Sequence, residues 1–238
     1  MDTTTSINKA RAYLSAQMQG VQARKQPSDH RVAFVTISRE SGAGGLIVAE
    51  HLAELLNKRG VGADVPWAVF EKNLLEKVVE ENELPESYMD QMEEKVLPAI
   101  QTAVSEMLAV HPSISRLAAM TSRTVLHVAS MGNAVLVGRG ANVLTENLSV
   151  GLHVRLIAPP DRRLRFLMAH HSLSRADAAE MMGEEDEGRR FYVKKHFNRD
   201  VDDPTLYDLV LNTDRVGHRA TAEVVAQALE IKVRDSRH

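Results

Sequence analysis

Short apolar runs alternate along the chain with longer segments in which apolar residues recur at helical spacing. The runs lie at 32–37, 134–137, 150–158 and 208–212, and a shorter candidate lies at 61–65. A continuous run of this kind, rich in β-branched residues, is typical of a strand buried on both faces of a parallel sheet. The pattern therefore predicts a sheet of five parallel strands.

The segments between these runs predict helices, because their apolar residues return every three or four positions. Strands joined by helices form right-handed crossovers. The predicted fold class is therefore α/β, a three-layer sandwich with the five-stranded parallel sheet in the middle. The predicted helices cover 46–59, 71–83, 86–110, 113–131, a basic helix with Asp161 as its N-cap, 174–182, 184–198 and 219–233.

Residues 1–30 precede this alternation. They hold a short amphipathic segment at 7–18 and then a polar stretch that contains Pro27. This predicts an N-terminal helical extension or linker in front of a domain that covers 31–238, and a frayed terminus is the alternative. On the two long helices before residue 131, the apolar stripe suits either the core or a homodimer interface, and periodicity does not separate the two.

Composition narrows the class of protein. The chain has 238 residues, 44% of them hydrophobic and none of them cysteine, which is typical of an ordinary globular protein without disulfides or thiolate metal sites. With 29 basic and 32 acidic residues the net charge is −3, so no overall field draws the chain to nucleic acid. The polar start and the absence of a long apolar run predict a cytoplasmic protein that does not enter a membrane.

Glycines follow the first predicted strand where the next helix begins. In an α/β sheet, ligands bind beyond the carboxyl ends of the strands. Backbone N–H groups in such a turn, at the positive end of a helix, can wrap a phosphate. The alternative is a strand-to-helix turn that contains glycines only because its backbone bends tightly, with no ligand bound. The candidate phosphate cradle consists of Ser38, Ser41, Gly42, Ala43, Gly44 and Gly45.

This turn departs from the P-loop pattern G-x-x-x-x-G-K-[ST]. With Gly44 as the second glycine, Gly45 stands at the lysine position and Leu46 at the position of the magnesium-binding hydroxyl. Arg39 stands at the first glycine, and it is a cation that could reach back over the loop. If the turn is a phosphate loop, either Arg39 or the lid cations described below would replace the missing lysine, and a carboxylate such as Glu40 would help nucleotide phosphates and water to hold Mg²⁺.

Other cations follow later predicted strands. Arg139 comes directly after a strand and a glycine, where a guanidinium can clamp a phosphate through two hydrogen bonds. Arg162, Arg163 and Arg165 open a helix, and one or two of them are expected to pair with acids because successive helical positions face different directions. These residues predict a local anion site in a chain of nearly balanced charge.

A further set of cations lies in the segment 184–199, which passes from acidic to strongly basic. Arg189, Arg190 and Lys194 have the spacing and charge of a mobile lid that supplies cations to a transferring phosphoryl group. A solvated charged helix is the alternative. No H-E-x-x-H pattern occurs, and no metal held by the protein alone is predicted.

Three motifs in this order resemble the cytidylate kinase-like family, relatives of the nucleoside monophosphate kinases with a P-loop kinase fold. They are Thr36 to Gly45 (TISRESGAGG), Val135 to Gly140 (VLVGRG) and Asp203 to Thr213 (DPTLYDLVLNT). The resemblance covers roughly residues 32–232. It departs from cytidylate kinases proper at Gly140, where an aspartate is usual, at Leu46, where a basic residue is common, and at Glu71, where an aspartate is usual.

The resemblance implies that Ser38 to Gly45 bind the phosphates of ATP, that Arg139 contacts the phosphate of the acceptor nucleotide, and that Arg189 and Arg190 are lid arginines in a lid at about 184–200. The expected activity is transfer of a phosphoryl group from ATP to a nucleoside monophosphate such as CMP, with Mg²⁺ bound mainly through the nucleotide. Arg39, Arg189, Arg190 and Lys194 would be the catalytic cations. The departures leave a second hypothesis, a nucleotide-binding or protein-interaction module that has lost phosphoryl transfer.

Overall fold

The computed structural model describes residues 12–13, 33–61, 65–71, 116–138, 140–148 and 150–236. Within them, five strands form one parallel sheet in the order β2-β3-β1-β4-β5. The predicted α/β fold with five parallel strands is confirmed. The strands are β1 (Phe34–Arg39), β2 (Ala68–Glu71), β3 (Ala134–Val137), β4 (Gly151–Ile157) and β5 (Leu209–Asn212).

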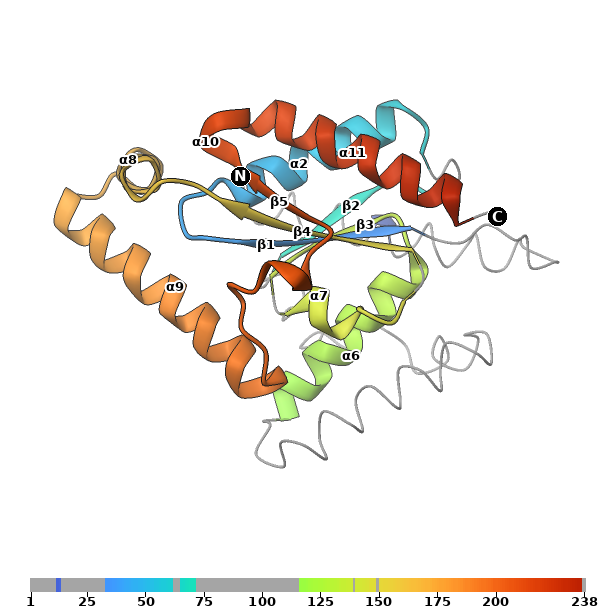
Figure 1. Cartoon of the computed structure of the whole chain (residues 1–238), viewed down its shortest axis with the longest axis horizontal. Coiled ribbons are helices and arrows are strands. Elements are labelled where there is room, and N and C mark those ends of the chain that lie inside the picture. Colours follow the sequence, from blue (N-terminus) through green and yellow to red (C-terminus); the bar gives the residue numbers. More distant parts are fainter. Residues whose placement is uncertain are drawn as a thin grey trace.

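Helices cover both faces of the sheet, as Figure 1 shows. One face carries α2 (Gly45–Lys58) and α11 (His218–Asp235), and the other carries α6 (Arg116–Met131) and the short α7 (Ala141–Leu144). Beyond the carboxyl ends of the strands lie α8 (Pro160–His171) and α9 (Arg175–Phe197), and α9 slants away from α8 toward α6. Two short helices, η1 (Pro204–Leu206) and α10 (Thr213–Val216), flank β5.

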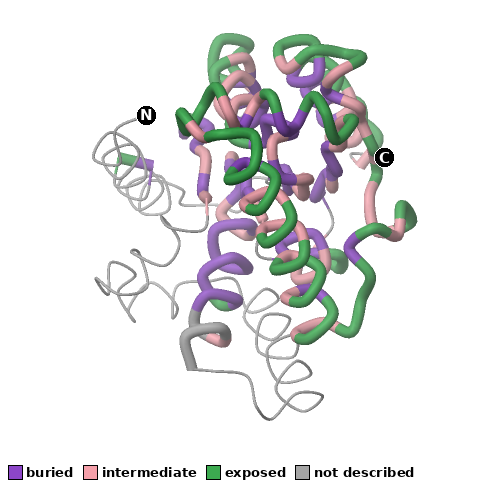
Figure 2. Tube along the Cα trace, turned by 90° about the vertical axis from the view of Figure 1, so that its left-hand side faces the viewer, coloured by how far each residue is buried: buried purple, intermediate pink, exposed green. Residues whose placement is uncertain are grey.

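The apolar core has two parts, one on each face of the sheet. Val35 packs with residues of α2 and α11 such as Leu52 and Val225. Its neighbour Phe34 packs on the other face with Val125 of α6. Successive side chains of a strand point to opposite faces, which is why an unbroken apolar run serves both cores. Figure 2 shows buried residues in the middle of the fold and mostly exposed ones along the outer helices.

Tyr13, near the N-terminus, packs in the second of these cores, the one that contains Phe34. Its side chain is fully buried, and its ring lies edge-on to Phe70 with 5.2 Å between the centroids. Its hydroxyl donates a hydrogen bond to the carbonyl of Gly132. Of the residues before 31, the structure describes only Ala12 and Tyr13, both in helical conformation.

The second strand lies later in the chain than the sequence predicts. Residues 62–64 of the strand predicted at 61–65 lie outside the described residues, and Val61 and Val65 at its two ends are not in a strand. The strand that pairs with β3 is β2, and Glu71, expected to start a helix, ends it. The side chain of Asn57 accepts a hydrogen bond from the N–H of Trp67 and donates one to its carbonyl. These bonds and the buried indole fix the chain at the end of α2, and pairing with β3 begins at Ala68.

The helices after β4 also differ from prediction. Residues predicted as two helices, 174–182 and 184–198, form the single helix α9. Gly183 and Gly188 both lie within α9, so neither glycine ends the helix. A Cβ atom added to either of them would meet no other atom within 4 Å. Asp161 is not the N-cap of α8 but lies in its first turn after the cap residue Pro159. The helices predicted at 71–83 and 86–110 lie outside the described residues, apart from Glu71.

Candidate functional site

The glycine turn joins β1 to α2 at the carboxyl edge of the sheet. Gly44 is the N-cap of α2 in a left-handed conformation, with φ 76°, and it offers no side-chain acceptor. The first three N–H groups of the helix, those of Gly45, Leu46 and Ile47, have no acceptor among the described residues, and the first turn holds no acid. These groups and the helix dipole form a positive end that suits an anion such as phosphate.

Arg39 runs directly over this turn. A Cβ atom added to Gly45 would lie 2.8 Å from Cγ of Arg39, and one added to Gly138 would lie 2.3 Å from its Nη1. The arginine stem therefore fills the space that a side chain at Gly45 would need, and its guanidinium occupies the space above Gly138. Arg39 thus passes the loop with its stem and ends with its guanidinium at the carboxyl end of β3.

A cavity of about 500 Å³ opens next to this arginine, between the carboxyl ends of β1 and β3 and the inner side of α9. Of the predicted site residues, it brings together Ser38, Arg39 and Arg189. Arg190, Lys194 and the glycine turn from Ser41 to Gly45 are not among its lining residues, and Arg139 lies outside the described residues. The cavity is lined by Thr36, Ile37, Ser38, Arg39, Glu71, Gly138, Gly140, Ala141, Asn142, Glu185, Gly188, Arg189, Tyr192, Val193 and Val201.

Five polar lining residues were not expected as site residues, namely Thr36, Glu71, Asn142, Glu185 and Tyr192. Glu71 ends β2, and Asn142 belongs to α7, a helix too short to give a sequence signal. Tyr192 follows the lid arginines on α9. The sequence could have indicated it as a site residue only because it is aromatic and stands in a charged segment. Glu71, Asn142 and Tyr192 give one cavity an acid, an amide and an aromatic ring beside two guanidinium groups.

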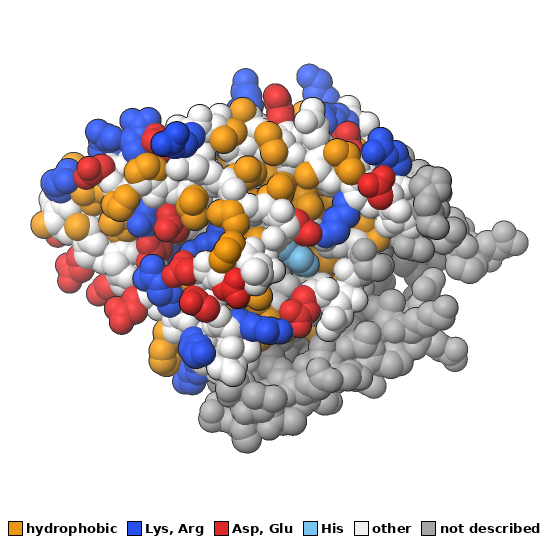
Figure 3. Space-filling model, in the orientation of Figure 1, with side chains coloured by type: hydrophobic (Ala, Val, Ile, Leu, Met, Phe, Trp, Pro, Cys, Tyr) orange, Lys and Arg blue, Asp and Glu red, His pale blue; other side chains and the backbone are white. Residues whose placement is uncertain are grey.

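Carboxylates of α9 contact the start of the glycine turn. The N–H of Ser41 donates to Oδ1 of Asp186 at 2.7 Å, and the hydroxyl of Ser41 donates to Oε2 of Glu185 at 2.6 Å. The lid helix thus approaches the loop with acids as well as with the expected cations. Figure 3 shows charged side chains of both signs gathered on the side of the molecule where α8 and α9 lie.

Arg163 of α8 connects these groups. Its side chain is 10% exposed and donates to Oδ2 of Asp186 at 2.5 Å and to the carbonyl of Ser41 at 3.2 Å. Its Nε lies 3.5 Å from Oε2 of Glu40, whose carboxylate also accepts the N–H of Ala158. The prediction that one or two of the α8 arginines pair with acids is confirmed, since Arg162 also pairs with Asp214.

Two of the three predicted lid cations, Arg189 and Arg190, are paired with acids in this conformation. Arg189 donates to Glu185 at 2.6 Å and to Asp186 at 3.0 Å. Burial alone would raise the pKa of Glu185, but the hydrogen bonds from Ser41 and Arg189 and the charges of Arg189 and Arg39 outweigh burial and lower it. Arg190 pairs instead with Asp202 at 2.8 Å, outside the cavity. Lys194 is exposed.

The last residue of α9 packs on Gly140, which lines the cavity. A Cβ atom added to Gly140 would lie 2.3 Å from the ring of Phe197, the last residue of α9. Gly140 also has φ 63° and is the N-cap of α7. An aspartate at position 140 would therefore collide with Phe197 unless the ring moved.

No group of three or more His, Asp or Glu residues within the described ranges could hold a metal ion by itself. Glu40 is not a lining residue of the cavity, because its carboxylate faces Ala158 and Arg163. A magnesium ion at this site would thus depend on phosphate oxygens and water for most of its ligands.

The sequence profile of the cytidylate kinase-like family matches residues 34–215, which include β1, the glycine turn, the cavity and α9. The chain belongs to this family. A cytidylate kinase of Methanocaldococcus jannaschii is 26% identical over 110 residues, 45% of this chain and 62% of that protein. The match to this relative covers less than half of this cytidylate kinase-like chain.

Two further proteins are similar to this chain, one in sequence and one in structure. A uronate isomerase of Corynebacterium glutamicum is 27% identical over 206 residues, 82% of this chain and 40% of that protein. The chain thus spans less than two thirds of either curated relative. The crystal structure of an uncharacterized protein from Eubacterium ventriosum has a TM-score of 0.61 with 17% identity, covering 83% of this chain and 98% of that one, which supports the fold. None of the described helices has the length and apolar character needed to cross a bilayer.

Proposed function

We propose that this cytidylate kinase-like protein transfers the γ-phosphoryl group of ATP to a small phosphorylated acceptor, with a nucleoside monophosphate such as CMP as the first candidate. In this reaction the bond between the γ-phosphorus and the β-phosphate oxygen breaks, and a bond from the same phosphorus to an acceptor phosphate oxygen forms. ADP and a nucleoside diphosphate leave. Mg²⁺, bound through the nucleotide phosphates, would neutralise part of their charge.

The observation that carries this proposal is the position of Arg39. Its stem lies against Gly45 at the positive end of α2, its guanidinium lies at Gly138, and the residue lines the cavity. We infer that the guanidinium can reach both a donor phosphate at the glycine turn and an acceptor in the cavity. Phosphoryl transfer depends on positioning and on cations that neutralise the charge spreading over the transferred group. Arg39 would supply the charge that the missing P-loop lysine supplies in other kinases.

The remaining predicted residues take related roles in this proposal. The backbone from Gly42 to Gly45, with Ser38 and Ser41 beside it, would hold the donor phosphates, and Arg139 the acceptor phosphate. Arg189 lines the cavity already and would contact the transferred group. Arg190 and Lys194 point elsewhere in this conformation and would need a movement of α9 to join it.

The second candidate is a nucleotide-binding or interaction module without transfer. Leu46 offers no hydroxyl to magnesium, and Phe197 fills the space next to Gly140. These two features weaken catalysis more than they weaken nucleotide binding. ATP binding without ADP production across a panel of acceptors would favour this candidate over the kinase.

The test measures binding of Mg·ATP and of CMP by calorimetry and ADP production by a coupled assay. We expect Arg39→Ala to weaken ATP binding and to lower turnover by about 10²- to 10³-fold, the effect typical of removing one preorganised donor. An acceptor panel would include nucleoside monophosphates and, because of the similarity to a uronate isomerase, a phosphorylated sugar acid. Full affinity and turnover in Arg39→Ala would refute the assigned role of Arg39.

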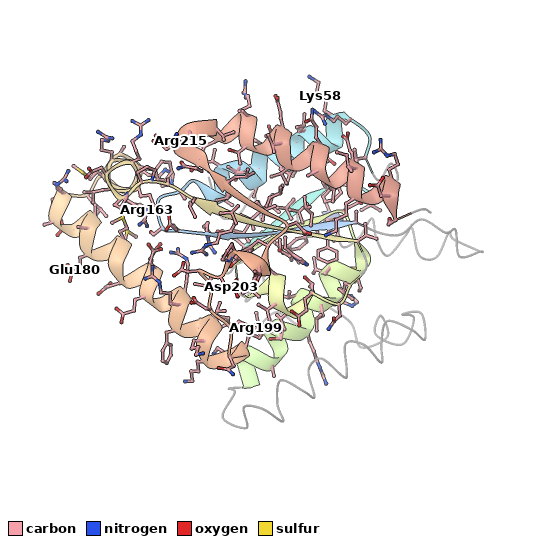
Figure 4. All side chains as sticks on the ribbon, viewed as in Figure 1. Lys58, Arg163, Glu180, Arg199, Asp203 and Arg215 are labelled. Carbon is pink, nitrogen blue, oxygen red and sulfur yellow. The ribbon has the colours of Figure 1, made fainter. Side chains whose placement is uncertain are left out.

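Lys58→Ala is the matched control. Lys58 is an exposed cation in the last turn of α2, about 20 Å from the glycine turn at the rise of an α-helix. Figure 4 shows it far from Arg163 and the loop. Since both variants lose one positive charge, a loss of binding confined to Arg39→Ala would reflect the site and not the net charge.

A further inference from the structure

Two acids of α9 occupy hydrogen-bond donors of the proposed phosphate loop. Asp186 accepts from the backbone N–H of Ser41 and from two guanidinium groups, those of Arg163 and Arg189. Glu185 accepts from the hydroxyl of Ser41 and from Arg189. Backbone N–H groups at a glycine turn, a hydroxyl and two arginines form the donor set that a phosphate group takes in proteins.

Burial shows that these contacts belong to the fold and not to the exposed surface. The side chain of Asp186 is 12% exposed and that of Arg163 is 10% exposed. An ionised carboxylate at that depth requires paired charges and hydrogen bonds, and Asp186 has them from both sides. Glu185, with 39% of its side chain exposed, forms the outer part of the same contact.

We propose that Glu185 and Asp186 are an internal anion held at the start of the glycine turn, and that the donor phosphates bind by displacing these two carboxylates. This inference rests on the phosphate-binding role proposed for the loop. The displaced acids would leave the N–H and hydroxyl of Ser41 free to bind a phosphate oxygen. The site is then closed by its own lid helix until a polyphosphate competes for it.

Displacement of the two carboxylates also changes the hydrogen-bond partners of Arg189. Here its guanidinium is neutralised by both acids, at 2.6 Å and 3.0 Å. When the acids leave Ser41, the incoming phosphate offers Arg189 a stronger partner in the same place, because a guanidinium binds phosphate through two parallel hydrogen bonds. One exchange of anions thus fills the donor site and supplies a lid cation to it.

The test compares Glu185→Gln/Asp186→Asn with Glu184→Gln/Glu187→Gln. Both double variants remove two acids from one turn of α9, but Glu184 and Glu187 are exposed and form no ion pair with any other described residue. The probes are Mg·ATP and inorganic triphosphate, which reports on the phosphate subsite without a base or ribose. Affinity is measured by calorimetry, and stability without ligand by urea unfolding.

We expect the first variant to bind both probes about tenfold more tightly than the wild type, because affinity rises when a competing occupied state is removed. It should also be less stable without ligand, since it loses the contacts of Ser41 and Arg163. The control variant should match the wild type in both properties. A purely electrostatic effect would tighten binding in both variants, and a purely structural role would lower stability without tighter binding. Either result would overturn the proposal.

The single variant Glu185→Gln covers the case in which the double variant does not fold, because it leaves the buried pair of Asp186 and Arg163 in place. We expect it to bind inorganic triphosphate about threefold more tightly. If the wild type binds ATP and Glu185→Gln binds no tighter, the internal anion is refuted and the phosphate loop stands. If neither the wild type nor any variant binds either probe, the proposed function fails and this inference fails with it.

Discussion

Arg39 and Gly45 share one space in this molecule. The arginine stem passes within 2.8 Å of the place where a Cβ of residue 45 would lie. A lysine at position 45 and an arginine at position 39 therefore exclude each other sterically, although either residue would supply a positive charge to the same phosphate site. Restoring the P-loop pattern in this chain requires a change at both positions.

This predicts strong coupling between the two positions. Gly45→Lys alone should destabilise the protein by about 1–3 kcal/mol, the usual cost of overpacking. In Arg39→Ala/Gly45→Lys the clash is relieved, so the double variant should be more stable than Gly45→Lys and should bind ATP better than Arg39→Ala. A double-mutant cycle of unfolding free energies, measured in urea, gives the coupling energy. Additive effects would show that the arginine stem does not occupy the lysine space.

At the scale of elements, α9 shows where sequence patterns succeed and where they stop. Its charges and its position after α8 were predictable, and so was its N-cap at Ser174, which accepts the N–H of Asp177. Its continuity through Gly183 was not, because glycine lowers helix propensity without abolishing it. Nor was the contact of Glu185 with Ser41, since a tertiary contact between residues 144 apart leaves no local pattern.

The strands show the same division. β1, β3, β4 and β5 were found close to their observed bounds, because each concentrates apolar residues in a short run. β3 is buried on both faces, whereas β5 lies at the edge of the sheet and exposes Val210. β2 has four residues, and it starts just after Trp67, whose N–H donates to the side chain of Asn57 and whose carbonyl accepts from it. Its place, and therefore the presence of Glu71 in the cavity, follows from a side-chain contact across a loop, which periodicity does not report.

The N-terminal segment gives a prediction at this scale. Tyr13 is fully buried against Phe70 and donates to the carbonyl of Gly132. Tyr13→Ala should lower the free energy of unfolding by about 3–5 kcal/mol, as expected for deleting a buried aromatic ring, and Tyr13→Phe by about 1 kcal/mol for the hydrogen bond. Urea unfolding followed by circular dichroism measures both. Wild-type stability in Tyr13→Ala would mean that this segment does not belong to the folded unit.

The whole molecule carries a pH dependence set by two buried histidines. Burial lowers the pKa of His127 to about 4. Burial also lowers the pKa of His153 to about 4, with Lys232 acting in the same direction and Asp208 against it. The ring of His153 lies against Thr36, with Nδ1 2.9 Å from Oγ1, so the neutral form is built into the sheet.

Both histidines should make the protein less stable in mild acid. Between pH 6.5 and 4 the unfolded chain takes up protons at these rings and the folded protein does not, so stability is lost as the pH falls. Each ring accounts for about 3 kcal/mol at most. His153→Gln should flatten the curve of unfolding free energy against pH in this window. The variant should still lose stability below about pH 4.5. There the carboxylates of Glu185 and Asp208, whose pKa values are lowered in the folded protein, take up protons in the unfolded chain first.

The packing of Phe197 on Gly140 also has a historical consequence. An aspartate at 140 requires a smaller residue at 197, and a phenylalanine at 197 requires a glycine at 140, because the ring lies 2.3 Å from where a Cβ would be. Once one partner has changed, reversion of the other alone passes through a strained and less stable protein. The two positions should therefore be inherited as a pair, and the chain's departure from the cytidylate kinase motif is entrenched by the end of its own lid helix.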